Sequence, residues 1–105
     1  MSVPEIDVHE LARLREQGAA LLDVRNLDEW EEARVPGVPL VPLPELAERV
    51  DEVPAGDPLY VICAGGVRSA KAVEHLLGLG HDAVNVAGGT KAWVEAGYPT
   101  DSGSE

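Results

Sequence analysis

Residues 58–80 read PLYVICAGGVRSAKAVEHLLGLG, and this stretch contains the pattern that decides the fold. PLYVIC is an apolar run without polar alternation, which is typical of a strand buried on both faces. After the short segment AGGV, the segment RSAKAVEHLLGLG has helical periodicity and ends in glycines. One face of this expected helix presents Ala70, Val73, Leu76 and Leu77. The stretch therefore predicts a strand, a tight loop and a helix in direct succession.

Strands and helices alternate over the rest of the chain as well. We expect helices at 6–18, 26–33, 44–53, 68–80 and 90–99, and strands at 19–25, 58–63 and 82–88. Near Leu40 and Val41 we expect at most two or three strand residues, because the flanking prolines cannot donate to a sheet ladder. Asp7 and Glu10 have the spacing of a capping box at the start of the first helix.

The alternation with short loops predicts an α/β fold with a mainly parallel central sheet and helices on both faces. A chain of 105 residues fits one domain, which we place at 1–105 with its core at about 5–99 and a frayed tail at 100–105. In such sheets, ligands bind beyond the carboxyl ends of the strands. The cysteine at the end of PLYVIC falls at such a strand end.

The composition excludes several classes of function. Lysine and arginine number 8 against 19 aspartate and glutamate, a formal net charge of −11. We therefore expect neither a nucleic-acid nor a membrane partner, because both are recognised by clustered basic residues. No apolar run approaches the ~20 residues of a membrane helix, and the acidic start is unlike a signal peptide. We expect a cytoplasmic protein, with its oligomeric state left open.

Cys63 is the single cysteine, so it has no internal disulfide partner. The cysteine and histidines also lack the spacing of metal ligands, and we expect neither a metal nor a cofactor. One interpretation is that Cys63 is a small buried hydrophobic residue, as free cysteines commonly are. The alternative is a reactive thiol, because Gly65 and Gly66 allow successive amides to form an anion-binding nest. Arg68 and Ser69 then begin a helix whose positive end faces the loop.

The free energy and the change in rate expected from a lowered thiol pKa indicate what such a loop would do. Lowering a thiol pKa from ~8.5 to ~7 needs about 2 kcal/mol, which a helix end and a nest can supply. Nucleophilicity falls with pKa, so the net gain in rate is only about threefold. Binding a second anionic group beside the sulfur and stabilising a charged covalent adduct is the better explanation.

The spacing of the loop separates two chemistries. Four residues lie between Cys63 and Arg68, whereas cysteine-dependent phosphatases have five. The smaller ring suits a single terminal sulfur better than a tetrahedral phosphate. An ionised thiolate also needs no neighbouring histidine as a general base.

Three segments together resemble the rhodanese family of sulfurtransferases. LLDVRNLDEWEEARVPGVPLVPLPEL resembles its first half, YVICAGGVRSAKAVEHLLGLG its active loop and helix, and VAGGTKAW its Gly-Gly and Ala-Trp signature. The resemblance covers about residues 5–99. Ala33 and Arg34 stand where the family often has Gly-His, which suggests that Arg34 replaces that histidine.

The resemblance implies a catalytic Cys63 that takes the outer sulfur of a small anionic donor and becomes a persulfide. A thiol, a protein or cyanide would then accept the sulfur. The residues implied in substrate binding are Ala64, Gly65, Gly66, Val67, Arg68 and Ser69. Asp23 and Arg25 would support the site structurally from the neighbouring strand end.

Two other functions stay open at this point. The domain could be a persulfide carrier or regulatory module with little turnover, which predicts persulfide formation and a specific basic partner. A phosphatase or arsenate reductase is a third interpretation, and the short loop argues against it. The acidic segment DEWEE is interpreted as a solvated face, Gly88 and Gly89 as a tight turn, and Trp93 as a core residue. Trp30 is placed either at the mouth of the site or against the strand that ends in DVR.

Overall fold

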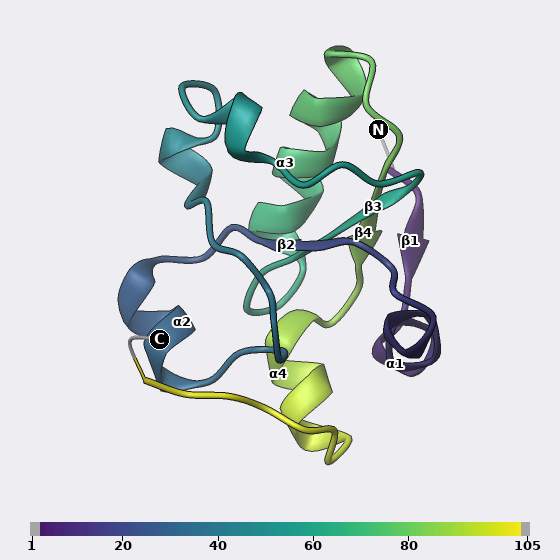
Figure 1. Cartoon of the computed structure of the whole chain (residues 1–105), viewed down its shortest axis with the longest axis vertical. Coiled ribbons are helices and arrows are strands. Elements are labelled where there is room, and N and C mark those ends of the chain that lie inside the picture. The colour runs from purple at the N-terminus through teal and green to yellow at the C-terminus, as the bar shows by residue number, and fades with distance from the viewer. Residues whose placement is uncertain (1–2, 104–105) are drawn as a thin grey trace.

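The computed structural model describes residues 3–103, and its centre is a four-stranded parallel sheet (Figure 1). The strands are β1 (Glu5–Ile6), β2 (Leu21–Asp23), β3 (Leu59–Ile62) and β4 (Ala83–Val86), in the order β1-β4-β3-β2. All three strand pairs are parallel, so their carboxyl ends meet at one edge. The expected α/β class and the three expected strands are confirmed.

Four α-helices connect and flank these strands. They are α1 (Val8–Glu16), α2 (Leu27–Glu32), α3 (Val67–Gly78) and α4 (Gly89–Glu95). The Asp7 side chain caps α1 by accepting from the Glu10 amide at 2.9 Å, as the spacing predicts. The glycine that follows α1, Gly18, has a φ of 87°, a left-handed conformation that glycine adopts without strain.

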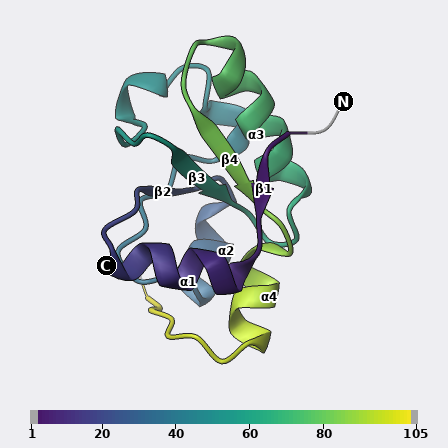
Figure 2. The ribbon, with the colours of Figure 1, turned by 90° about the vertical axis from the view of Figure 1, so that its right-hand side faces the viewer.

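The helices cover both faces of the sheet (Figure 2). The two core clusters show that side chains of β3 alternate between these faces. Leu59 and Val61 point to the face covered by α3, whereas Tyr60 and Ile62 point to the face covered by α1 and α4. The α3 face is closed by Ala72, Val73 and Leu76. The other face is closed by Val8, Leu11, Val35, Val38 and Trp93. Trp93 is therefore a core residue, as expected.

Four local expectations differ from the structure. Residues 44–53 form no continuous α-helix but two short 3₁₀ helices, Leu43–Glu45 and Val50–Glu52. The backbone leaves the helical region at Arg49, with φ −118° and ψ 24°, and the interruption lets Leu46 and Val50 both pack on the α3 core. Residues Glu5–Ile6 form the edge strand β1 ahead of α1, and two residues are too few to show periodicity.

The third difference concerns the apolar face of α3. The structure buries Ser69, Ala72, Val73 and Leu76, while Leu77 remains 39% exposed. The short strand expected near Leu40 is a single parallel bridge to Asp23.

Residues 101 and 103 are paired with the domain. Asp101 and Arg34 exchange both backbone hydrogen bonds, at 3.0 and 2.9 Å, and the Gly103 amide donates to Glu31 O at 2.7 Å. The Arg34 side chain also donates to Gly103 O at 2.7 Å. The expectation of a frayed tail therefore does not fit residues 101–103, and residues 104–105 lie outside the described part of the chain.

None of the helices within residues 3–103 is both long enough and apolar enough to cross a membrane.

Candidate active site

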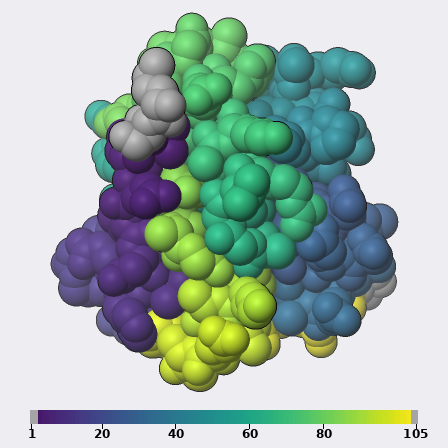
Figure 3. Space-filling model, turned by 180° about the vertical axis from the view of Figure 1, so that it is seen from behind, coloured from purple at the N-terminus to yellow at the C-terminus, as the bar shows by residue number. Residues whose placement is uncertain are grey.

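The carboxyl ends of the three central strands bring together segments that are far apart in the sequence. Asp23 ends β2, Cys63 follows β3, and Gly88 with Gly89 follows β4. In the space-filling view, the green surface of α3 adjoins the yellow-green surface of α4, with the blue α2 region beside them (Figure 3). This edge is where parallel α/β sheets bind ligands.

Cys63 lies beneath its loop with its sulfur facing hydrogen-bond donors. The residue is 1% exposed, and on one side it joins the apolar α3 core. On the other side, Sγ accepts from the Gly66 amide at 3.0 Å and lies 3.2 Å from Ser69 Oγ. The thiol is therefore buried, as the first interpretation expects, and it also faces a polar loop, while its reactivity stays a prediction.

The surroundings of the thiol lower its pKa. Burial is the largest single influence and acts to raise the pKa of Cys63. The Ser69 hydroxyl and the amides of Ser69, Gly66 and Gly65 together outweigh it, and the pKa falls below its ordinary value. Gly65, Gly66 and Ser69 therefore stabilise negative charge on the sulfur. The predicted roles in substrate binding stay predictions for all six loop residues, Ala64, Gly65, Gly66, Val67, Arg68 and Ser69.

Backbone hydrogen bonds from α4 hold the cysteine loop in place. The amides of Thr90 and Lys91 donate to the carbonyls of Cys63 and Ala64, at 2.8 and 3.0 Å. This close approach requires Gly89, because a Cβ there would lie only 2.6 Å from Ala64 O and closer still to Cys63 O. The Gly-Gly pair thus forms the expected turn and also fixes the backbone of the cysteine loop.

Asp23 and Arg25 form a buried ion pair next to β3. Arg25 Nη2 lies 2.7 Å from Asp23 Oδ2, and the same nitrogen donates to Ala33 O at 2.8 Å. Both residues are at most 5% exposed. Because the guanidinium and carboxylate bind each other, the geometry is consistent with structural support.

Arg68 is bound by Glu29, which belongs to the acidic segment DEWEE expected to be a solvated face. Its two terminal nitrogens each donate to one oxygen of Glu29 at 2.8 Å, a bidentate pair. The hydrogen bond from Arg68 is the main reason why the pKa of Glu29 falls to about 2. Glu29 also accepts from the Asn26 amide, which fixes it at the start of α2.

A hollow of about 540 Å³ opens beside the loop at Ala64. Its charged lining comprises Arg25, Glu29, Glu32, Lys91 and Glu95. Thr90 also lines it, and its buried hydroxyl makes no hydrogen bond within residues 3–103. Within the same residues, no group of three or more histidines, cysteines or carboxylates is placed to hold a metal ion.

Arg34 and Trp30 make contacts that join α2 to segments other than the cysteine loop. Arg34 stacks over the ring of Trp30 at 3.6 Å and donates to Trp30 O and Gly103 O. Trp30 Nε1 donates to Val38 O at 3.1 Å. These contacts tie α2 to neighbouring segments, which favours the packing interpretation of Trp30 and gives Arg34 a structural role.

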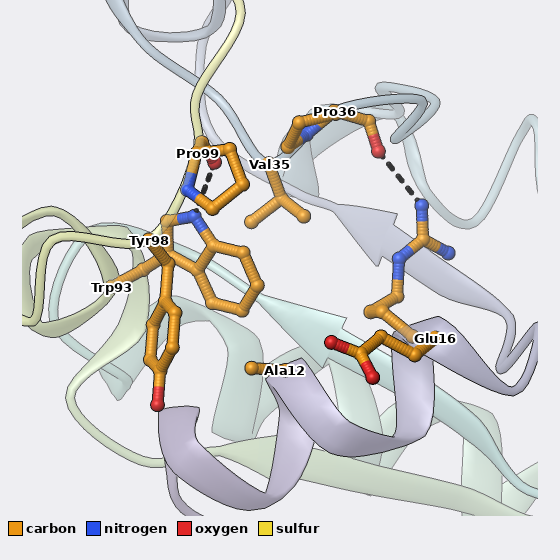
Figure 4. Close-up of a pocket in the computed structure, with 8 residues that line it drawn as sticks. Ala12, Glu16, Val35, Pro36, Trp93, Tyr98 and Pro99 are labelled. Atoms are coloured by element: carbon orange, nitrogen blue, oxygen red, sulfur yellow. Dashed lines mark hydrogen bonds between the residues drawn. The ribbon is translucent and has the colours of Figure 1, made fainter.

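A second cavity, of about 300 Å³, lies between α1, α4 and the loop after Arg34 (Figure 4). Its walls are largely apolar and include Val35, Trp93 and Pro99, and Trp93 Nε1 donates to Pro99 O at 2.7 Å. Arg15 at its edge donates to Pro36 O at 2.8 Å. None of its lining residues belongs to the cysteine loop.

The model of the rhodanese-like domain family matches residues 7–96. The chain belongs to this family. The matched range contains the strand ends, the Cys63 loop and the Gly-Gly turn described above.

Two relatives with assigned names show what this rhodanese-like domain is similar to. Thiosulfate sulfurtransferase 18 of Arabidopsis thaliana is 33% identical over 98% of this chain and 87% of its own length. YrkF of Bacillus subtilis, named as a candidate sulfur carrier protein, is 36% identical over 89% of this chain. The chain spans about half of that relative's length, 52%.

A solved structure confirms the fold of the rhodanese-like domain. The rhodanese-related protein of Thermoplasma volcanium superposes with a TM-score of 0.86 at 35% identity. The alignment covers 93% of this chain and 97% of that protein.

Proposed function

We propose that this rhodanese-like domain is a sulfurtransferase that moves a sulfane sulfur through a persulfide on Cys63. The observation that supports it best is the convergence of the Gly66 amide and the Ser69 hydroxyl on a buried Sγ. Donors aimed at one sulfur stabilise a thiolate and, after reaction, the charge on an attached outer sulfur. The named relatives include a thiosulfate sulfurtransferase, which agrees with this chemistry.

The reaction takes two displacements. The Cys63 thiolate attacks the outer sulfur of the donor, and the donor's S–S bond breaks with its electron pair. Sulfite leaves if the donor is thiosulfate, and a thiolate leaves if it is a persulfide. An acceptor, cyanide or a thiolate, then attacks the outer sulfur of the Cys63 persulfide, and the Cys63 thiolate is released. No net oxidation or reduction occurs.

The ion pairs at the mouth of the hollow disfavour a donor that needs an unpaired arginine to bind its anionic group. The two arginines of the site are already paired, Arg25 with Asp23 and Arg68 with Glu29. A thiosulfate dianion would have to displace Glu29 from Arg68 or rely on exposed Lys91. We therefore assign a protein-bound or small-molecule persulfide as the preferred donor, with thiosulfate as a poor one.

Replacing Glu29 by glutamine should improve the use of thiosulfate. The neutral amide competes less with the sulfonate for Arg68, so KM for thiosulfate should fall about fivefold, the equivalent of ~1 kcal/mol for a partly exposed ion pair. KM for glutathione persulfide should change much less. Steady-state thiocyanate formation with each donor measures both values.

Glu32→Gln is the matched control for this prediction. It removes one carboxylate from the lining of the same hollow and leaves the Arg68 pair with Glu29 in place. Equal effects of the two substitutions would show that general charge, and not release of Arg68, determines the preference for the donor.

A persulfide carrier with little turnover is the second candidate. Three carboxylates, Glu29, Glu32 and Glu95, line the hollow and would suit a basic protein surface. The similarity to YrkF agrees with this candidate. Single-turnover transfer distinguishes the two: an enzyme passes sulfur to cyanide or glutathione rapidly, whereas a carrier holds its persulfide until a protein acceptor is added.

A further inference from the structure

Asn85 is a buried polar residue in β4 that no motif predicted. It is 1% exposed, and its strand reads Ala-Val-Asn-Val, so Asn85 is the one polar residue of β4. Its Nδ2 donates to Glu5 Oε2 at 3.0 Å and to Gly66 O at 3.2 Å. Its Oδ1 lies 2.5 Å from Ser69 Oγ. Asn85 thus connects strand β1, the cysteine loop and the first turn of α3.

The orientation of this amide follows from its partners. Glu5 Oε2 and Gly66 O are both acceptors, so the nitrogen of the Asn85 side chain must face them. The oxygen then faces Ser69 Oγ, where it can only accept. A reversed amide would set oxygen against two acceptors.

The single hydroxyl proton of Ser69 therefore has two possible hydrogen-bond acceptors. Its hydroxyl lies 2.5 Å from Asn85 Oδ1 and 3.2 Å from Cys63 Sγ. A hydroxyl donates one hydrogen bond at a time. When Ser69 donates to Asn85, its oxygen can accept from the thiol form of Cys63. When Cys63 is a thiolate, donation to sulfur must break the bond to Asn85.

We propose that Asn85 is a positioning residue that competes with the Cys63 thiolate for the proton of the Ser69 hydroxyl. In the thiol form, the Cys63 thiol donates to Ser69 Oγ and the Ser69 hydroxyl donates to Asn85 Oδ1, so both hydrogens have an acceptor. In the thiolate form, Ser69 donates to the charged sulfur only by giving up its hydrogen bond to the Asn85 carbonyl, so the sulfur gains less net stabilisation. Asn85 therefore keeps the thiolate more basic and more nucleophilic than its amide contacts alone would.

The competition has a consequence for the catalytic cycle that rests on the proposed function. In the persulfide, the negative charge moves to the outer sulfur, and Sγ becomes a neutral inner sulfur. Ser69 then returns to Asn85 without losing a charged partner. The arrangement disfavours the free thiolate relative to the persulfide, so it favours formation of the persulfide on Cys63.

Other charges around the thiol are the same with and without Asn85. Arg68 of α3 is paired with Glu29 of α2, and Arg25 is paired with Asp23 after β2. Other charged side chains near this edge include Glu5 of β1, Glu32 of α2, and Lys91 and Glu95 of α4. A substitution at Asn85 changes the contacts of Glu5 alone among them, because Glu5 loses its hydrogen bond from Asn85 Nδ2, and Glu5→Gln tests the contribution of that charge.

The test is the pH profile of Cys63 alkylation by iodoacetamide in Asn85→Leu, a variant of similar volume without an acceptor. The apparent pKa of the thiol should fall by about one unit, since hydrogen bonding to the charged form favours it. Above this pKa, the alkylation rate should also fall. Gly66 O keeps a bond from the Ala70 amide, so the loop retains an anchor. Asn85→Val is the second variant if Asn85→Leu does not fold.

Two controls identify the route of the effect. In a Ser69→Ala background the same Asn85 substitution should leave the thiol pKa unchanged, because no hydroxyl remains to compete for. Glu5→Gln still offers an oxygen to Asn85 Nδ2 and should also leave the pKa unchanged.

An unchanged or raised pKa in the Asn85 variants would overturn the proposal, because loss of a purely structural contact would loosen the amides around the sulfur. An equal fall in the Ser69→Ala background would also overturn it. Alkylation requires no sulfur donor, so these results are independent of whether the domain transfers sulfur.

Discussion

Cys63→Ser should lower sulfur transfer to cyanide or glutathione by at least about 10³-fold, because the intermediate requires a sulfur nucleophile. A serine hydroxyl is of similar size and can accept the same hydrogen bonds from Gly66 and Ser69. It is not ionised at neutral pH and forms no persulfide. Thiocyanate formation with thiosulfate and with glutathione persulfide measures the loss.

The sequence contains one cysteine, so no second thiol can substitute for it. The variant should retain the thermal unfolding midpoint of the parent within a few degrees, since the change conserves shape in a site with polar partners. Residual activity near that of the parent, in a folded variant, would rule out the persulfide mechanism. Activity lost together with the fold would be checked with Cys63→Ala.

Gly89→Ala should produce the largest loss of stability of any single change at the site. The added Cβ would lie 2.6 Å from Ala64 O, and both neighbouring carbonyls are backbone atoms that cannot turn away. Left-handed strain at a φ of 59° contributes about 1–2 kcal/mol. Overpacking contributes about 1–3 kcal/mol more, for a total loss of roughly 2–5 kcal/mol. Urea unfolding measures this free energy.

Gly97→Ala is the matched control for this clash. Gly97 has a φ of 83°, and a Cβ there would meet no atom within 4 Å. Only the conformational strain of about 1–2 kcal/mol should remain. The thiol pKa should rise in Gly89→Ala, because the displaced loop moves its amides from Sγ, and should not change in Gly97→Ala. Equal losses of stability in both variants would contradict the close-approach argument.

The sequence predicted the architecture because its signals are local and repeated. The apolar runs of β2 and β3 and the periodicity of α3 each identify their element, and their alternation identifies a parallel sheet. The position of Cys63 at a strand end followed from the same pattern. By contrast, residues 44–53 have helical spacing but fold as two 3₁₀ turns, because packing of Leu46 and Val50 determines the backbone there.

The partners of the loop could not be found from the sequence, because they come from distant elements. Glu29 is 39 residues from Arg68, and its acidic surroundings indicate a solvated face. Asn85 is 16 residues from Ser69, although a lone polar residue within an apolar strand is a signal that a buried partner exists. The resemblance left open whether Arg34 replaces a family histidine, and the structure shows Arg34 bound to Trp30 O and Gly103 O.

The intact mass of the protein after treatment with glutathione persulfide tests the central claim most directly. The account predicts a gain of one sulfur atom, located on Cys63 by peptide mapping and removed by a reductant or by cyanide. With thiosulfate, the same adduct should form more slowly. An unchanged mass with both donors, in protein whose thiol remains free and reactive, would contradict the claim that this loop holds a persulfide.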